Sequence, residues 1–200
     1  MLLSIDKKFI CLNPPKTGSG YREIHLNDFA IVSNRDNRDL KCRHWNVKDV
    51  ESYLAKNNIN PDVFTWFTFV RNPWDRIVSW YNMIVNHTLR DNKHITRDDL
   101  LTEESFTKFI RSTILHNQLD DYMIRQGQEI DFVGSLENIN TDLSAIIKRL
   151  NLDIDALKTH KPFLESYHDD INALWTPETI DSVAKVEANV INKFNYKFKG

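Results

Sequence analysis

Hydrophobic residues follow two different spacings along this chain, and these spacings predict its strands and helices. Two short runs, Phe9–Leu12 and residues 64–70, are almost continuously apolar, aromatic or β-branched, and each ends at Asn-Pro or Arg-Asn-Pro. Such runs are typical of strands buried on both faces of a parallel sheet. Residues 130–133, stopped by Gly134, form a third candidate strand.

Four longer segments repeat their apolar residues at the i, i+3, i+4, i+7 spacing of a helix with one buried face. They run over residues 74–85, 106–114, 143–150 and 180–194. Asn72-Pro73 and Thr176-Pro177 each offer an N-cap side chain followed by proline at the first helical position, so they mark two helix starts. Strands that alternate with such helices predict an α/β sheet with helices on both faces.

Length and charge restrict what the chain can do. Its 200 residues fit one domain over residues 1–200, and 26 Lys and Arg against 28 Asp and Glu give a net charge of -2. This nearly balanced net charge does not attract nucleic acid or an acidic membrane surface, so a bound anion needs a local site. Charges at residues 6–8 interrupt any signal peptide, and no run reaches the ~20 apolar residues of a membrane span. We expect a cytoplasmic protein with both cysteines reduced.

A glycine-containing turn follows the first predicted strand. Residues 13–22 read Asn-Pro-Pro-Lys-Thr-Gly-Ser-Gly-Tyr-Arg, so Gly18 and Gly20 lie between a strand and a helix, next to Lys16 and two hydroxyl side chains. Glycines at such a turn let backbone N–H groups converge on an anion at the positive end of the helix. The segment predicts a phosphate site; the alternative is an ordinary turn with a solvated lysine.

A P-loop kinase or nucleotide triphosphatase is a second interpretation of this turn. Its motif, GxxxxGK[ST], places lysine directly after the second glycine, whereas here Tyr21 follows Gly20 and Lys16 precedes both glycines. Such an enzyme also needs an acidic Mg²⁺ ligand at the end of a neighbouring strand. The strand at residues 64–70 is followed by Arg71 instead, so both motifs argue against this class of enzyme. Mg²⁺-dependent ATP turnover would support it.

A second anion site is predicted by Arg71 and Ser79. Arg71 stands at the carboxyl end of a predicted strand, and Ser79 lies about two turns into the following helix. The guanidinium can hold a phosphate bidentately, and the hydroxyl adds a neutral hydrogen bond. In the alternative, Arg71 only pairs with Asp75 to tie the turn. Both motifs fall at the carboxyl ends of strands, where ligands sit in open α/β sheets.

Residues 15–20 and 70–81 together resemble the paired 5′- and 3′-phosphate-binding motifs of sulfotransferases that use 3′-phosphoadenosine 5′-phosphosulfate (PAPS). The likeness is to the carbohydrate and heparan-type branch, and residues 131–143 and 194–198 are similar to later segments of that branch. The resemblance implies a P-loop-like three-layer fold with a central parallel sheet flanked by helices. It also implies direct transfer of a sulfuryl group to an acceptor hydroxyl.

The resemblance assigns roles to residues of this chain. Arg71 and Ser79 would hold the 3′-phosphate, and Lys16 would also reach the bridging oxygen as charge develops on the leaving group. No metal is implied, because fixed cations and backbone donors can serve a sulfuryl group, which carries less charge than a phosphoryl group. The residues that would hold the 5′-phosphate are Lys16, Thr17, Gly18, Ser19, Gly20 and Tyr21.

Direct transfer needs a general base near the acceptor hydroxyl. His44 lies between the two phosphate motifs, where the resembling branch commonly has a histidine, and it is the expected base. The alternative bases are Asp39, Asp36, Glu23 and His25.

Residues 159–168 take the place of a loop that closes over the nucleotide in the resembling family. Within them, Lys161 and Ser166 are candidates for a 3′-phosphate contact.

The expected acceptor is a small phenolic or saccharide hydroxyl compound. A polysulfated or uronate-rich polymer would need a long basic groove, and the balanced charges give no sign of one. We expect no nucleic-acid or membrane partner. A third hypothesis is a non-catalytic nucleotide-binding module, which would bind 3′-phosphoadenosine 5′-phosphate (PAP) yet transfer nothing.

Overall fold

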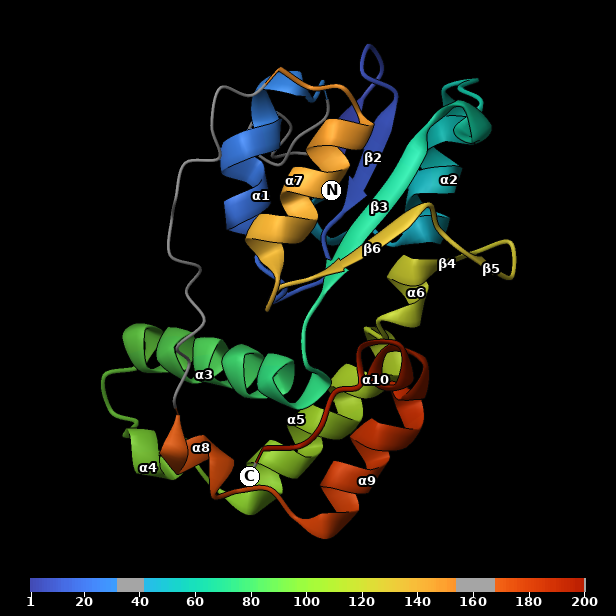
Figure 1. The fold of residues 1–200 in the computed structure, drawn as a ribbon. Helices are drawn as coiled ribbons and strands as arrows, with labels where there is room; N and C mark the ends of the chain where they lie inside the picture. Colours follow the sequence, from blue (N-terminus) through green and yellow to red (C-terminus); the bar gives the residue numbers. More distant parts are fainter. Residues whose placement is uncertain (32–41, 154–167, 200) are drawn as a thin grey trace. The chain divides into compact units, whose positions relative to one another are not determined.

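Four strands of the computed structural model form one sheet, in the order β1-β2-β3-β6 (Figure 1). β2 (Phe9–Leu12), β3 (Thr65–Val70) and β6 (Phe132–Ser135) are parallel, which confirms the predicted parallel sheet. β1 (Leu2–Ser4) pairs antiparallel with β2 at one edge and was not predicted. The structure describes residues 1–31, 42–153 and 168–199.

The third strand begins and ends two residues later than its sequence pattern predicts. The Asp131 carboxylate accepts a hydrogen bond from the Trp66 backbone N–H at 2.8 Å, so strand pairing starts after it, at Phe132. The sequence predicts that Gly134 stops the strand, but in the structure Gly134 lies within it. A Cβ there would come 2.7 Å from the Phe69 ring, so glycine is required for packing between neighbouring strands.

Two compact units make up the chain. The sheet unit comprises Met1–Val70 and Leu119–Leu164, and the helical unit comprises Arg71–Gln118 and Glu165–Gly200. Whether they act as one domain stays a prediction.

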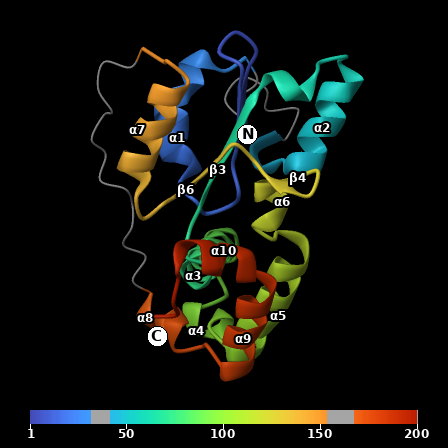
Figure 2. The same ribbon diagram turned by 45° about the vertical axis from the view of Figure 1, so that its right-hand side comes forward.

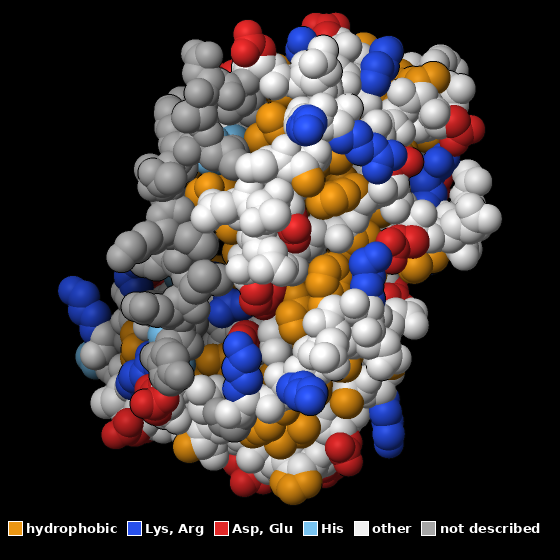
Figure 3. Space-filling view, viewed as in Figure 1, with side chains coloured by type: hydrophobic (Ala, Val, Ile, Leu, Met, Phe, Trp, Pro, Cys, Tyr) orange, Lys and Arg blue, Asp and Glu red, His pale blue; other side chains and the backbone are white. Residues whose placement is uncertain are grey.

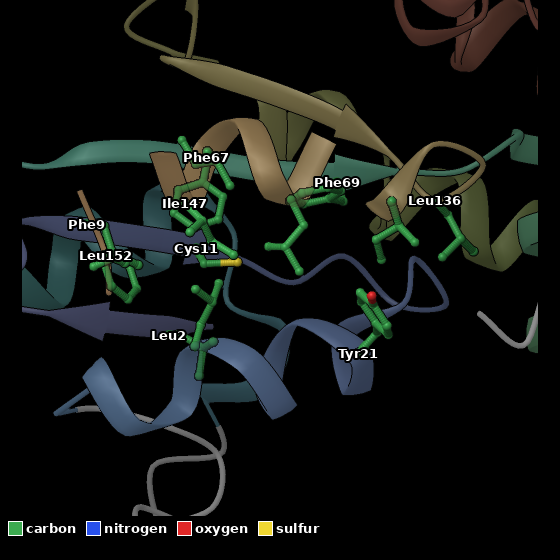
Figure 4. Close-up of a cluster of buried hydrophobic side chains, with 13 residues drawn as sticks. Leu2, Phe9, Cys11, Tyr21, Phe67, Phe69, Leu136, Ile147 and Leu152 are labelled. Carbon is green, nitrogen blue, oxygen red and sulfur yellow. The ribbon is translucent and has the colours of Figure 1, made fainter. Parts of the chain in front are cut away.

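Helices flank the sheet within the sheet unit (Figures 1 and 2). α1 (Ser19–Leu26) and α7 (Ile139–Arg149) cover one face, and α2 (Val47–Lys56) and α6 (Asp120–Met123) lie on the other. Alternate strand residues point to the first face, where they form the apolar cluster of Figure 4. The expected α/β fold with a mostly parallel sheet is confirmed. The cluster includes Leu2, Phe9, Cys11, Phe67, Phe69, Leu136, Leu143 and Ile146.

Short elements complete the sheet unit. They are η1 (Asn27–Phe29), η3 (Cys42–His44), η4 (Pro61–Val63) and the hairpin of β4 (Ile124–Arg125) and β5 (Gln128–Glu129). η3 carries His44, the base expected from the sequence.

The helical unit contains three of the four predicted amphipathic helices, and the fourth, predicted over residues 143–150, is α7 of the sheet unit. Asn72 caps α3 by accepting from the N–H groups of Trp74 and Asp75, and Thr176 forms a capping box at α9, so both predicted helix starts are confirmed. The last predicted helix is divided at Glu187, where the backbone leaves helical geometry. The helices are α3 (Pro73–Asp91), α4 (Arg97–Leu100), α5 (Glu103–His116), α8 (Asp169–Asn172), α9 (Pro177–Val186) and α10 (Ala188–Phe194).

Among the helices that the described residues form, none has the length and apolar character needed to cross a membrane.

Candidate functional site

The turn between β2 and α1, residues 13–18, has an unusual backbone. Lys16 and Gly18 both adopt left-handed conformations, with φ of 65° and 80°. Gly18 is the N-cap of α1, and no side chain caps the helix there. The first two N–H groups of the helix, on Ser19 and Gly20, have no carbonyl partner within it, as in every α-helix. They are therefore oriented to bind an anion at the positive helix end.

Gly18 also lies against the apolar core. A Cβ at this position would come 2.6 Å from Cδ1 of Leu136, whereas a Cβ at Gly20 would meet nothing within 4 Å. The first glycine is therefore fixed both by its backbone conformation and by packing. The second is fixed by neither.

We expect Gly18→Ala to lower the free energy of unfolding by about 2 to 4 kcal/mol, because left-handed strain and overpacking add together. Gly20→Ala is the matched control, and it should be neutral or up to about 1 kcal/mol stabilising through helix propensity. Urea unfolding of both variants measures the difference. Equal stability of the two would contradict the structure of this turn.

Arg22 holds the turn from inside the protein. Its guanidinium is fully buried; Nε and Nη2 donate to Oδ1 of Asn13 at 3.2 and 2.9 Å, and Nη1 donates to the Thr17 carbonyl. Nη2 also lies 3.3 Å from the Thr17 hydroxyl, and the guanidinium carbon lies 5.0 Å from the centre of the Phe69 ring. Arg22 thus joins both ends of the turn.

The side chains of Thr17 and Tyr21 are occupied within the sheet unit. The Thr17 hydroxyl is buried and donates to the Pro14 carbonyl at 2.8 Å. The Tyr21 hydroxyl donates to Oδ1 of Asn140 at 2.5 Å, which ties α1 to α7, and burial raises its pKa. Figure 4 shows Tyr21 among the residues of the apolar cluster.

His44 is attached to the same turn. Its Nδ1 lies 2.8 Å from the carbonyl oxygen of Asn13. Because a carbonyl only accepts hydrogen bonds, Nδ1 must carry the proton, and Nε2 keeps its lone pair in the neutral ring. Burial of part of the ring lowers the pKa of His44, and the nearby cations Arg43 and Arg22 add to this effect. The imidazole is therefore neutral near pH 7 and able to accept a proton at Nε2.

The His44 main chain is held from two further sides. The Tyr122 hydroxyl donates to the His44 carbonyl at 2.9 Å. The amino group of Met1 donates to the carbonyls of Cys42 and Arg43 at 2.7 and 2.6 Å. The short helix η3 thus presents the imidazole from a fixed backbone.

The alternative bases have different surroundings. Glu23 lies 3.8 Å from Arg43 in an ion pair, and His25 is buried with its ring 4.9 Å from that of Tyr21. Asp36, Asp39 and the segment with Lys161 and Ser166 lie outside the described residues.

Arg71 and Ser79 belong to the helical unit. Arg71 directly precedes the N-cap of α3, Ser79 lies on α3, and both side chains are buried. Asp75, the alternative partner of Arg71, lies 3.9 Å from Nζ of Lys199. The two predicted phosphate motifs therefore lie in different units of the chain.

Sequence reasoning missed two residues of this site, Asn13 and Arg22. A signal for Arg22 was present: it lies four residues before Leu26, on the apolar face of a short helix. A charge on such a face indicates a buried polar contact. Asn13 carried no comparable signal. The described residues contain no group of three His, Cys, Asp or Glu side chains that could hold a metal ion.

Most of the sequence is similar to one known protein family. The model of the "Sulfotransferase family" matches residues 3–193. An uncharacterized protein of Archaeoglobus fulgidus is 25% identical over 109 residues, which cover 50% of this chain and 82% of that protein. No solved structure matches the chain.

Proposed function

The chain belongs to the sulfotransferase family, and from this premise we propose that it transfers the sulfuryl group of PAPS to a hydroxyl of a small phenolic or saccharide acceptor. Family membership supports sulfuryl transfer in general. The donor, the acceptor and the roles of individual residues are the proposal. The observation that carries it is the uncapped N-terminus of α1, preceded by left-handed Gly18 and Lys16.

The 5′-phosphate of the donor is proposed to bind at the N-terminus of α1. Backbone N–H groups of Ser19 and Gly20 would donate to its oxygens, and the Lys16 ammonium would add a full positive charge. The Thr17 hydroxyl is already bonded to Pro14, so its part in this site is to hold the backbone of the turn. Tyr21 contributes in the same way, through Asn140.

The 3′-phosphate is proposed to bind Arg71 and Ser79. An arginine fork suits a phosphate dianion because it offers two parallel N–H donors. Both side chains are buried, and charge-assisted hydrogen bonds are stronger away from water. This contact would distinguish PAPS from ATP and AMP, which lack the 3′-phosphate.

The proposed reaction is an in-line displacement at sulfur. The acceptor oxygen forms a bond to sulfur while the bond from sulfur to the bridging oxygen of the 5′-phosphate breaks, and PAP leaves. The proton of the acceptor hydroxyl passes to Nε2 of His44, which the Asn13 carbonyl holds in the required tautomer. Lys16 stabilises the charge that develops on the leaving oxygen.

A small acceptor agrees with the surface charge. In Figure 3, basic and acidic side chains are interspersed over the visible face of each unit. A polyanionic acceptor would favour one extended basic surface. An assay with labelled PAPS across phenols and saccharides identifies the acceptor class.

Ligand-induced thermal shifts test the donor assignment. We expect PAP to stabilise the protein far more than AMP, because AMP lacks the 3′-phosphate that Arg71 and Ser79 are proposed to bind. A ligand at 100 times its Kd adds about 2.7 kcal/mol to the free energy of unfolding. The stabilisation by PAP should disappear in Arg71→Ala. Arg90→Ala, in the exposed last turn of α3, is the charge-matched control and should retain it.

Other outcomes would favour the other hypotheses. Equal stabilisation by AMP and PAP, or turnover of ATP with Mg²⁺, would support the kinase or nucleotide triphosphatase class. Binding of PAP without transfer to any acceptor would support a non-catalytic module.

A further inference from the structure

Arg22 is a buried cation without a carboxylate partner among the described residues. Its side chain is fully buried, and its hydrogen bonds run to the Asn13 amide oxygen and to the Thr17 carbonyl and hydroxyl. A charge in such a place costs stability unless its contacts compensate for lost hydration. A leucine or methionine would fill the same space without this cost, so the retained charge calls for another reason.

Asn13 links Arg22 to His44. Its side-chain Oδ1 accepts two N–H groups from Arg22 and lies 3.7 Å from the Cys11 sulfur. Since arginine only donates, the orientation of the amide is fixed, with Nδ2 pointing away from Arg22. On the other side, the main-chain carbonyl of Asn13 accepts from Nδ1 of His44. One residue thus contacts both the buried cation and the proposed base.

The amide nitrogen of Asn13 is buried and has no hydrogen-bond partner among the described residues. An unpaired buried donor costs stability, so Asn13 is not optimised for the fold alone. An aspartate would accept from Arg22 equally well and would have no unpaired N–H. It would also place a negative charge beside the turn proposed to bind phosphate.

We propose that Arg22 is a positioning residue that acts through Asn13 and Thr17, fixing the phosphate-binding turn and the tautomer of His44 together. The inference rests on the proposed function for its effect on turnover. The geometry behind it is a single chain of hydrogen bonds within the sheet unit, from Thr17 through Arg22 and Asn13 to His44. The left-handed backbone at Lys16, a non-glycine residue, is strained and needs such support from its surroundings.

Lysine cannot replace Arg22 in this role. The guanidinium reaches Asn13 and Thr17 at once with three different nitrogens, whereas an ammonium is a single donor group on a flexible stem. Arg22→Lys therefore preserves the charge and removes the bridge. Asn13→Leu removes the side-chain acceptor of Arg22 instead and keeps the main-chain carbonyl that bonds His44, so it should have the same effect. It serves as the second test should Arg22→Lys fail to fold.

The experiment measures the ring tautomer of His44 by ¹⁵N NMR and the turnover of each variant. In the wild type we expect the Nδ1–H tautomer. In Arg22→Lys and Asn13→Leu we expect a mixture of tautomers, a changed low-pH limb of kcat/KM and a kcat lower by about tenfold or more. Asn13→Asp keeps the acceptor for Arg22, so it should retain the wild-type tautomer.

Arg125→Lys is the matched control. Arg125 also belongs to the sheet unit and lies 5.1 Å from an aromatic ring, that of Trp66, but its ion pairs with Glu51 and Asp62 hold other elements. It should leave the His44 tautomer and kcat close to wild type. An unchanged tautomer in Arg22→Lys, or a loss of kcat no larger than in Arg125→Lys, would overturn the inference. If the wild type transfers no sulfuryl group, the proposed function fails, while the tautomer comparison still decides the role of Arg22.

Discussion

Lys16→Ala is expected to turn over about 10² to 10³ times more slowly than the wild type, the usual loss for one preorganised donor to developing charge. The bridging oxygen gains most of its negative charge in the transition state, so the ammonium is worth more there than in the bound donor. The loss should therefore lie mainly in kcat. Steady-state rates with saturating PAPS measure it.

Lys8→Ala is the matched control for this variant. Lys8 is also a lysine of the sheet unit with a left-handed backbone, at a φ of 53°, but it lies in the turn between β1 and β2. Its removal should leave turnover close to wild type. If Lys16→Ala raised only KM, the ammonium would bind the donor equally in both states, and its proposed role at the leaving group would be wrong.

Local signals in the sequence were sufficient for much of the fold. Asn72-Pro73 and Thr176-Pro177 predicted two helix starts, and the structure shows the expected side-chain caps. These signals work because a cap involves residues only two or three positions apart. The same holds for the turn at Gly18, where a strand, two glycines and a lysine follow one another directly.

Contacts between distant residues could not be predicted in this way. Asn13 and His44 are separated by 31 residues, and nothing in either neighbourhood specifies their hydrogen bond. β1 has only three residues, too few for a recognisable pattern. The apolar spacing resumes beyond Glu187, at Val190 and Ile191, so it gave no sign that the last helix divides there.

Glu187 and Arg76 form a buried ion pair in the helical unit. Their atoms Oε1 and Nη2 are 2.9 Å apart, and the side chains are 1% and 0% exposed. Nη2 of Arg76 also donates to the Asn117 carbonyl at 2.9 Å, so this guanidinium connects α3, the end of α5 and the junction of α9 and α10. The hydrogen bonds of Arg22 run to neutral groups, whereas Arg76 forms an ion pair with a carboxylate.

We expect Glu187→Ala to lower the free energy of unfolding by about 3 to 5 kcal/mol, because removing one partner leaves a charge buried in the helical unit. Glu178→Ala is the control: Glu178 pairs with Arg111 at 2.8 Å, but their side chains are 73% and 64% exposed. That exposed pair should contribute less than about 1 kcal/mol. Chemical denaturation of both variants, with the midpoint and slope fitted together, gives the two values.

A double variant separates the ion pair from its packing. Replacing both charges, as in Arg76→Met with Glu187→Leu, removes the buried cation together with its partner, and such replacements of buried pairs are often neutral or stabilising. We therefore expect the double variant to be more stable than Glu187→Ala, despite carrying one more substitution. If it were less stable, the loss in Glu187→Ala would come from missing side-chain volume at the junction of α9 and α10, and not from the loss of the carboxylate that pairs with Arg76.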